Sequence, residues 1–195
     1  MSSYCKRIRE RSTLRFICGL IVRIRSFWKI RRKVVRMRKL GAMVGSPIGI
    51  CPSVIVPASP NLKIGNHVSI HTDQIDVRAP IEIGDYVIIG SDVRIITCSH
   101  DINDKDFSLK VYGLKIEDYA WIATGALILP SCRHIGRGAV IGAGAVVVKD
   151  VPDMAVVSGN PATILKYREC VHEDLVPEAF FGGDLIQYVA ARRNK

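Results

Sequence analysis

A single histidine gives the first chemical clue in this sequence. Residues 95–101 read IITCSHD, so His100 stands where an apolar run ends and a polar stretch begins. A neutral imidazole has a pKa of roughly 6.5 and can remove a proton from a hydroxyl group at neutral pH. A histidine in a surface loop would look the same over so short a stretch, and the surrounding sequence has to decide between the two interpretations.

The stretch that follows His100 is a polar insertion. Residues 101–115 read DINDKDFSLKVYGLK and hold too few aliphatic side chains to be buried as regular strand. Loops carried on a rigid scaffold are frequent places for binding and catalysis. The Asp101 carboxylate can accept hydrogen bonds from hydroxyl groups, and the Tyr112 ring can stack on a flat apolar surface. We therefore expect both residues to contact substrate.

The elements that must position these residues follow a period of six. Aliphatic residues recur at six-residue steps, with seven-residue slips at 70–77 and 128–135 and one step of 21 residues across the insertion: Ile64, Ile70, Val77, Ile83, Ile89, Ile95, Ile116, Ile122, Ile128, Ile135, Ile141 and Val147. This period matches neither the two-residue period of a strand nor the 3.6-residue period of a helix. Repeats of constant length are typical of solenoids, in which each repeat buries its apolar face against its neighbours.

A short strand and a tight corner account for each step. One large aliphatic side chain points inward, and residues such as Gly65, Asn66 and Asp85 then tolerate the left-handed backbone that a sharp corner requires. Three steps return the chain to its starting face, which gives coils of roughly 18 residues. We therefore predict an all-β protein built as a parallel β-helix. A β-sandwich, the alternative, would not keep one register through so many repeats.

Three further stretches of sequence indicate which protein family the chain resembles. They are SHD at 99–101, DYAWIATGALILPSCRHIGRGAVIGAGAVVVKDVP at 118–152 and VVSGNPA at 156–162. Together with the repeats, they resemble the hexapeptide-repeat acetyltransferases, whose fold is a left-handed parallel β-helix. The resemblance covers roughly residues 60–170. It points to the branch that holds galactoside, maltose and nodulation-factor acetyltransferases, xenobiotic acetyltransferases and the O-acetyltransferases of surface polysaccharides.

The resemblance implies a role for individual residues. His100 takes the place of the general base, and acetyl-CoA is the expected co-substrate, with no metal. The expected cofactor-binding positions are Trp121, Thr124, Ala143, Lys149 and Lys166. Thr163 departs from the pattern, because galactoside-type enzymes carry an arginine there. The family also implies a homotrimer, in which each acetyl-CoA groove lies between two chains.

The basic charge is concentrated at the N-terminus. Residues 1–40 hold 14 Lys and Arg and one acid, a net of +13, whereas the other 155 residues hold 14 Lys and Arg and 17 acids, a net of −3. Apolar residues from Leu14 to Val34 form an approximate helical stripe among these cations. Such a helix can lie on an anionic membrane surface. Packing on the trimer is the alternative, and the absence of a base-reading motif argues against nucleic acid.

The sequence predicts that the chain divides into three parts. We expect a basic amphipathic segment over 1–45, the β-helix domain over 46–170 with its insertion at 101–115, and a tail over 171–195 that is helical in part. ATILKYRE after Pro161 and DLIQYVAARRNK are the predicted capping helices. The longest uncharged apolar stretch, FICGLIV at 16–22, is shorter than the roughly 20 residues that cross a bilayer. Six scattered cysteines suggest no disulfide framework, so we expect a cytoplasmic protein that can attach peripherally to the inner membrane face.

These observations predict an acetyl-CoA-dependent O-acetyltransferase that uses His100 to acetylate a sugar hydroxyl. The acceptor suggested by the polar loop and the basic segment is a surface polysaccharide or its lipid-linked precursor. Xenobiotic or free-sugar acetylation is the nearest alternative. Two other classes share this fold, a γ-type carbonic anhydrase and a non-catalytic scaffold. The five histidines lack the spacing of the first, and the SHD and Trp121 motifs speak against the second.

Overall fold

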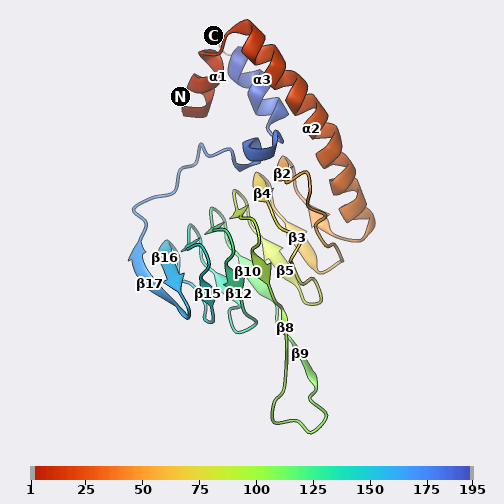
Figure 1. Cartoon of the computed structure of the whole chain (residues 1–195), viewed down its shortest axis with the longest axis vertical. Coiled ribbons are helices and arrows are strands. Elements are labelled where there is room, and N and C mark those ends of the chain that lie inside the picture. Colours follow the sequence, from red (N-terminus) through yellow and green to blue (C-terminus); the bar gives the residue numbers. More distant parts are fainter. Residues whose placement is uncertain (1–2, 194–195) are drawn as a thin grey trace.

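A computed structural model describes residues 3–193, and a parallel β-helix forms its centre (Figure 1). Short strands form three faces, and the strands of successive coils pair in parallel. The first face consists of β1 (Met43–Val44), β3 (Leu62–Ile64), β5 (Ile81–Ile83), β10 (Leu114–Ile116) and β13 (His134–Ile135). The predicted solenoid is therefore confirmed.

The other two faces differ in length. The second face runs through β2 (Ile48–Ile50), β4 (Val68–Ile70), β6 (Ile88–Ile89), β11 (Trp121–Ile122), β14 (Val140–Ile141), β16 (Ala155–Gly159) and β17 (Ala162–Tyr167). The third holds β7 (Arg94–Ile95), β12 (Leu127–Ile128) and β15 (Val146–Val147). The second face is thus the longest continuous surface of the solenoid.

The six-residue anchors form the core, as the period predicts. Strand pairing places Ile89, Ile122 and Ile141 in one register on the second face, and all three side chains are fully buried. The residue after an anchor lies at a crowded corner. A Cβ atom on Gly90 would lie 2.8 Å from the backbone nitrogen of Thr124 in the next coil. Small residues at this position therefore let successive coils stack closely.

The insertion leaves the solenoid as a hairpin. β8 (Cys98–His100) pairs antiparallel with β9 (Leu109–Val111), and the hairpin projects away from the coils in Figure 1. Its base is tied to the preceding coil, because the Thr97 hydroxyl donates to the Asp76 carbonyl over 3.0 Å. The hairpin therefore leaves the solenoid from a fixed position, at the corner between the third and first faces.

A helical cap covers the N-terminal end of the solenoid. α1 (Ser3–Arg9) and α2 (Thr13–Lys39) precede the first coil, and the Ser12 hydroxyl caps α2 by accepting from the backbone N–H of Arg15. Ile30, Val34 and Met37 of α2 pack into the solenoid core. No helix within residues 3–193 combines the length and the apolar character that crossing a bilayer requires.

The prediction of a helix directly after Pro161 is wrong. ATILKY forms β17, which turns back and pairs antiparallel with β16 at the last coil. β-Branched and aromatic side chains in this segment favour a strand, and β16 offers an open edge for pairing. The chain then returns along the solenoid to its N-terminal end (Figure 1). There η1 (Pro177–Phe181) contacts β2 and β4, and the predicted helix α3 (Leu185–Arg193) contacts α1 and α2.

Candidate functional site

A groove on the second face brings three of the predicted cofactor residues together. A cavity of about 740 Å³ is lined by Trp121, Thr124 and Ala143, among other residues. Its volume lies within the range of roughly 300–1,000 Å³ that is typical of small-molecule sites. Strand alternation explains the position of Trp121, which points outward and is half exposed while Ile122 is buried in the core. Thr124 and Ala143 lie at the corner beyond it, in adjacent coils.

The corner that carries Thr124 and Ala143 keeps its backbone accessible. Gly125 and Gly144 adopt left-handed φ angles of 71° and 67°, and the Gly144 N–H donates to the Thr124 carbonyl over 2.9 Å. A Cβ atom on Gly144 would meet nothing within 4 Å. A ligand can therefore approach the backbone closely at this corner.

The opposite wall of the groove is an aromatic stack that sequence reasoning missed. The rings of His67, Tyr86 and Tyr119 stack in parallel, with centroids 4.5 Å and 4.8 Å apart. Burial raises the pKa of both tyrosines, so their hydroxyls stay protonated. Arg137 covers the stack, with its Cζ atom 4.8 Å from the Tyr119 ring. The signal was present in the sequence, because the three residues occupy the same position of successive repeats.

The returning C-terminal segment closes the groove on its outer side. His172, Leu175 and Phe180 line the cavity, and the Arg168 guanidinium donates to the Gly138 carbonyl over 3.1 Å. His71 also faces the groove, and burial lowers the pKa of its imidazole. The groove is therefore lined mainly by apolar and aromatic groups, together with the Arg168 cation.

His100 lies on the hairpin with its imidazole exposed. Nδ1 lies 2.6 Å from the Phe107 carbonyl oxygen, and the ring stacks on Phe107 at 4.7 Å. A carbonyl oxygen only accepts, so Nδ1 must carry the hydrogen and Nε2 presents a lone pair. This is the protonation pattern that a general base requires.

The two loop residues expected to contact substrate have partners of their own. Asp101 and Lys110 form an ion pair across the hairpin at 2.7 Å, and Lys110 holds the pKa of the Asp101 carboxyl below its usual range. The Arg133 guanidinium lies 4.8 Å above the Tyr112 ring. Both contacts stiffen the base of the hairpin around His100.

Within one chain, His100 and the groove lie at different corners of the solenoid. His100 follows β7 on the third face, whereas Trp121 lies on the second face. The two remaining predicted cations are also separate from the groove: Lys149 is exposed after β15, and Lys166 is exposed on β17. Within residues 3–193, no cluster of His, Cys, Asp or Glu side chains has the arrangement of a metal site.

Comparison with known proteins identifies the family. The chain is 30% identical over 139 residues to the putative colanic acid biosynthesis acetyltransferase WcaF of Escherichia coli, covering 71% of this chain and 76% of that protein. A solved maltose O-acetyltransferase from Clostridium difficile is 28% identical, with a TM-score of 0.62 and coverage of 86% of each chain. No family model matches the chain.

The fold also matches a hexapeptide-repeat acetyltransferase from Vibrio cholerae, which has been solved both without and with acetyl coenzyme A. The first of these structures has a TM-score of 0.62 at 24% identity and covers 85% of this chain and 93% of that one. The acetyl coenzyme A complex has a TM-score of 0.52 at 22% identity and covers 87% and 91%. With its repeats and its similarity to the E. coli protein, the chain belongs to the hexapeptide-repeat acetyltransferase family and is an acyltransferase.

Proposed function

We propose that this protein transfers an acetyl group from acetyl-CoA to a saccharide hydroxyl, with His100 as the general base. The observation that carries the proposal is the hydrogen bond from His100 Nδ1 to the Phe107 carbonyl, because it leaves Nε2 free to accept a proton. The groove of Trp121, Thr124 and Ala143 supplies an apolar channel for the pantetheine arm. Relatives with acetyltransferase names and the acetyl-CoA complex of a protein with the same fold support this choice of donor.

The reaction needs one proton carrier. His100 Nε2 removes the proton of the acceptor hydroxyl as its oxygen forms a bond to the thioester carbonyl carbon. The carbon–sulfur bond then breaks, and the imidazolium returns the proton to the leaving thiolate. Lys149 and Lys166 are the cations we assign to the phosphates of the cofactor, although neither lines the groove of the chain itself.

The separation of His100 from the groove supports a homotrimer with shared sites. A base at one corner of a triangular prism and a groove on another face can meet when identical chains pack side by side around a threefold axis. The hairpin projects away from the coils of its own chain, as such an arrangement requires (Figure 1). In this arrangement, His100 of one copy would face the groove of the next.

Substitution of His100 tests the base. His100→Ala should lower kcat by about 10²–10⁴-fold, the usual contribution of general-base catalysis, as measured by thiol release from acetyl-CoA with a panel of sugars. His134→Ala is the matched control, because His134 lies half-exposed on the first face and pairs with Glu117 at 3.2 Å. Full activity of His100→Ala would remove the residue from the mechanism.

Mixing two inactive variants tests the shared site. His100→Ala and Trp121→Ala subunits, mixed and reassembled, should recover activity, because some sites would combine an intact histidine with an intact groove. Light scattering should give three times the chain mass of 21.6 kDa. If each active site were formed within a single chain, the mixed subunits would recover no activity.

The acceptor we propose is a saccharide of a surface polysaccharide or its lipid-linked precursor. The name of the E. coli relative, a putative acetyltransferase of colanic acid biosynthesis, supports this class. The exposed hairpin adds carboxylate and amide groups at Asp101, Asn103 and Asp104, which suit hydrogen bonding to sugar hydroxyls. Because the hairpin is exposed, it leaves more room for a long saccharide chain than an enclosed pocket for a small molecule would.

The outer face of α2 supports attachment to an anionic membrane. Ile30, Val34 and Met37 face the solenoid, so the predicted apolar stripe is split between two sides of the helix. An outward stripe stays exposed at Leu14, Ile17, Ile21, Ile24 and Trp28. Exposed apolar residues three and four positions apart, flanked by arginines and lysines, are typical of helices that lie in the membrane interface. We assign the protein to the inner membrane face.

Vesicle sedimentation tests this attachment. The full-length protein should bind vesicles that contain anionic lipid and dissociate as salt rises, because screening weakens the attraction of the cations. The double variant Ile21→Gln/Trp28→Gln should lose binding. Leu165→Gln is the control, since Leu165 is 65% exposed on β17, at the far end of the solenoid from α2. Equal binding by all three proteins would rule out this face of α2.

A further inference from the structure

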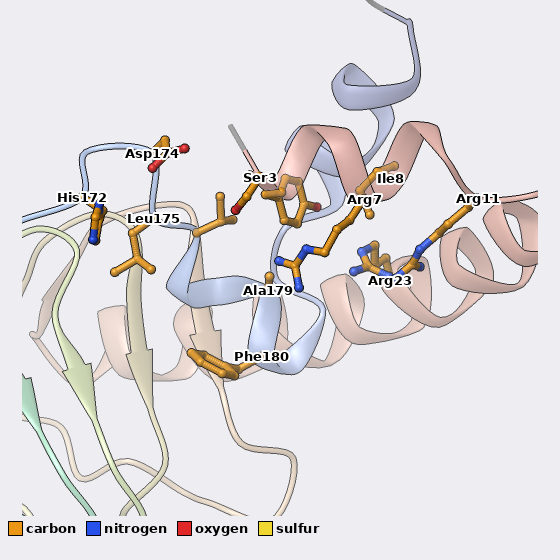
Figure 2. A pocket seen from close by; sticks show the side chains of 12 residues that line it. Ser3, Arg7, Ile8, Arg11, Arg23, His172, Asp174, Leu175, Ala179 and Phe180 are labelled. Atoms are coloured by element: carbon orange, nitrogen blue, oxygen red, sulfur yellow. The ribbon is translucent and has the colours of Figure 1, made fainter. Parts of the chain in front are cut away.

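A second cavity lies between the helical cap and the returning C-terminal segment. It has a volume of about 700 Å³, and side chains from α1, α2 and η1 line it (Figure 2). Arg7, Arg11 and Arg23 contribute three guanidinium groups, and Ile8 and Phe180 contribute apolar surface. Figure 2 shows the three arginines reaching into the same region beside η1. A cavity with a cationic side and an apolar side is suited to an organic anion.

The cap holds two of the arginines in place. The Arg23 Nε atom lies 2.9 Å from Oδ1 of the fully buried Asp184, and its Cζ atom lies 3.8 Å above the Tyr188 ring. The Arg11 guanidinium donates to the Tyr188 hydroxyl over 3.2 Å. Tyr188 is fully buried, and its contacts with Arg11 and Arg23 hold both guanidinium groups in place. Guanidinium groups that are already ordered lose little further freedom when they bind an anion.

The cationic charge around this cavity is incompletely neutralised. Asp184 pairs with Arg23, and Asp174 lies on the rim, well away from the arginines in Figure 2. Within residues 3–193, the guanidinium group of Arg7 makes no hydrogen bond or ion pair, and that of Arg11 has no carboxylate partner. Like charges gathered around one space repel each other, and a bound anion would relieve that repulsion. Arginine forks match the oxygens of a phosphate group.

The cavity adjoins the groove that we assign to the pantetheine arm. His172, Leu175 and Phe180 line both spaces. η1 contacts β4, and β4 lies two strands from the Trp121 strand β11, which places these two strands about 10 Å apart. A sugar ring attached to a phosphate in the cavity can therefore extend toward the groove. Lys166, by contrast, lies on β17 at the other end of the solenoid, where we place the cofactor phosphates.

We propose that this cavity binds the phosphate or diphosphate group of the saccharide acceptor. The identity of the acceptor rests on the proposed function, whereas the anion site rests on the arginines alone. The guanidinium groups of Arg7 and Arg11 hold the phosphate, and the apolar side formed by Ile8 and Phe180 contacts the group attached to it. A phosphorylated sugar is thereby favoured over a neutral one.

Calorimetry with the full-length protein tests the site directly. Glucose 1-phosphate and pyrophosphate are the probes, and methyl glucoside is the neutral comparison. Arg7→Gln should weaken binding of both phosphates about tenfold or more, because it removes charge-assisted hydrogen bonds. Arg36→Gln is the matched control, since Arg36 is an exposed arginine of α2 that lines neither cavity. The thermal midpoints of both variants should match that of the wild type.

Three outcomes would overturn the proposal. They are the failure of both phosphates to bind the wild type, unchanged binding by Arg7→Gln/Arg11→Gln, and weaker binding of coenzyme A rather than of glucose 1-phosphate by Arg7→Gln. The last result would assign the cavity to the cofactor. None of these measurements requires turnover, so a failure of acetyl transfer in the sugar panel would be distinguishable from a failure of the anion site.

Discussion

The solenoid and the helical cap are stabilised in opposite ways. Stacked isoleucines fill the solenoid, and every coil repeats the same inward position, as with Ile83, Ile116 and Ile135 on the first face. The cap instead buries two carboxylates, Asp184 and Glu178, which are both fully inaccessible. The solenoid therefore depends on many similar apolar contacts, and the cap combines a small apolar cluster with a few buried polar contacts.

The difference shows where each region is vulnerable. Burial of one isoleucine contributes about 1.5–3 kcal/mol, so the stability of the solenoid is divided among many equal parts. A buried ion pair contributes little in net terms, but removal of one partner leaves an unpaired charge in a dry environment. Loss of one polar residue should thus open the cap while the coils stay intact.

The largest effect is expected for Asp184→Ala. Asp184 accepts from the Tyr4 hydroxyl and pairs with Arg23, so its removal strands a buried guanidinium and should cost about 3–5 kcal/mol in the cap. Hydrogen exchange should accelerate in α1 and α3 and stay unchanged in the strands. Asp73→Ala, at an exposed position of the solenoid, is the control. Faster exchange throughout the solenoid would show that the two regions unfold together.

A change in an isoleucine ladder should behave differently. Ile122→Ala should lower the free energy of unfolding by about 2–5 kcal/mol, because Ile122 lies fully buried between Ile89 and Ile141. Denaturant unfolding measures this loss, and exchange should accelerate in neighbouring coils on both sides. Ile55→Ala, which removes an exposed side chain, should change the free energy by less than about 1 kcal/mol. Equal losses of unfolding free energy in the two variants would mean that the stacked isoleucines of the core stabilise the fold no more than an exposed isoleucine does.

The smallest expected effect is a pH dependence at the base of the hairpin. The Arg78 guanidinium holds the pKa of Asp76 well below its usual range, and the Thr97 N–H adds to this effect while partial burial opposes it. A carboxyl with a lowered pKa stabilises the fold at pH values above roughly 4 and loses that contribution as the pH falls further. The difference in unfolding midpoint between wild type and Asp76→Asn should therefore be constant from neutral pH to about 5 and shrink below about 4. A constant difference down to pH 2 would contradict this assignment.

Sequence information was uneven between the same two regions. The anchors and corners of the solenoid repeat locally, so the period alone predicts which side chains are buried. The family resemblance implied that Trp121, Thr124 and Ala143 belong to one cofactor site. The cap has no such pattern. Tyr4 meets Asp184 across 180 residues and His67 meets Glu178 across 111, and nothing near either residue signals its partner. β17 was misjudged because its strand character depends on the open edge of β16, a tertiary feature.

The site shows the same division. The resemblance pointed to His100, but the Phe107 carbonyl that orients its ring comes from the far side of the hairpin, where sequence spacing gives no geometry. The stacked tyrosines repeat in the sequence and could have been found. The roles of His100, Lys149 and Lys166 stay predictions, and the His100→Ala variant addresses the first of them.

The meeting of both chain ends in one cap has a consequence for the order of assembly during synthesis. Coils can form one after another as they leave the ribosome, since each pairs with the coil before it. Tyr4 and Ile8, by contrast, pack against Tyr188 and Ala191, which are made about 180 residues later. Helix α1 must therefore wait for α3, and its apolar and cationic side chains stay open to other partners until α3 has been made.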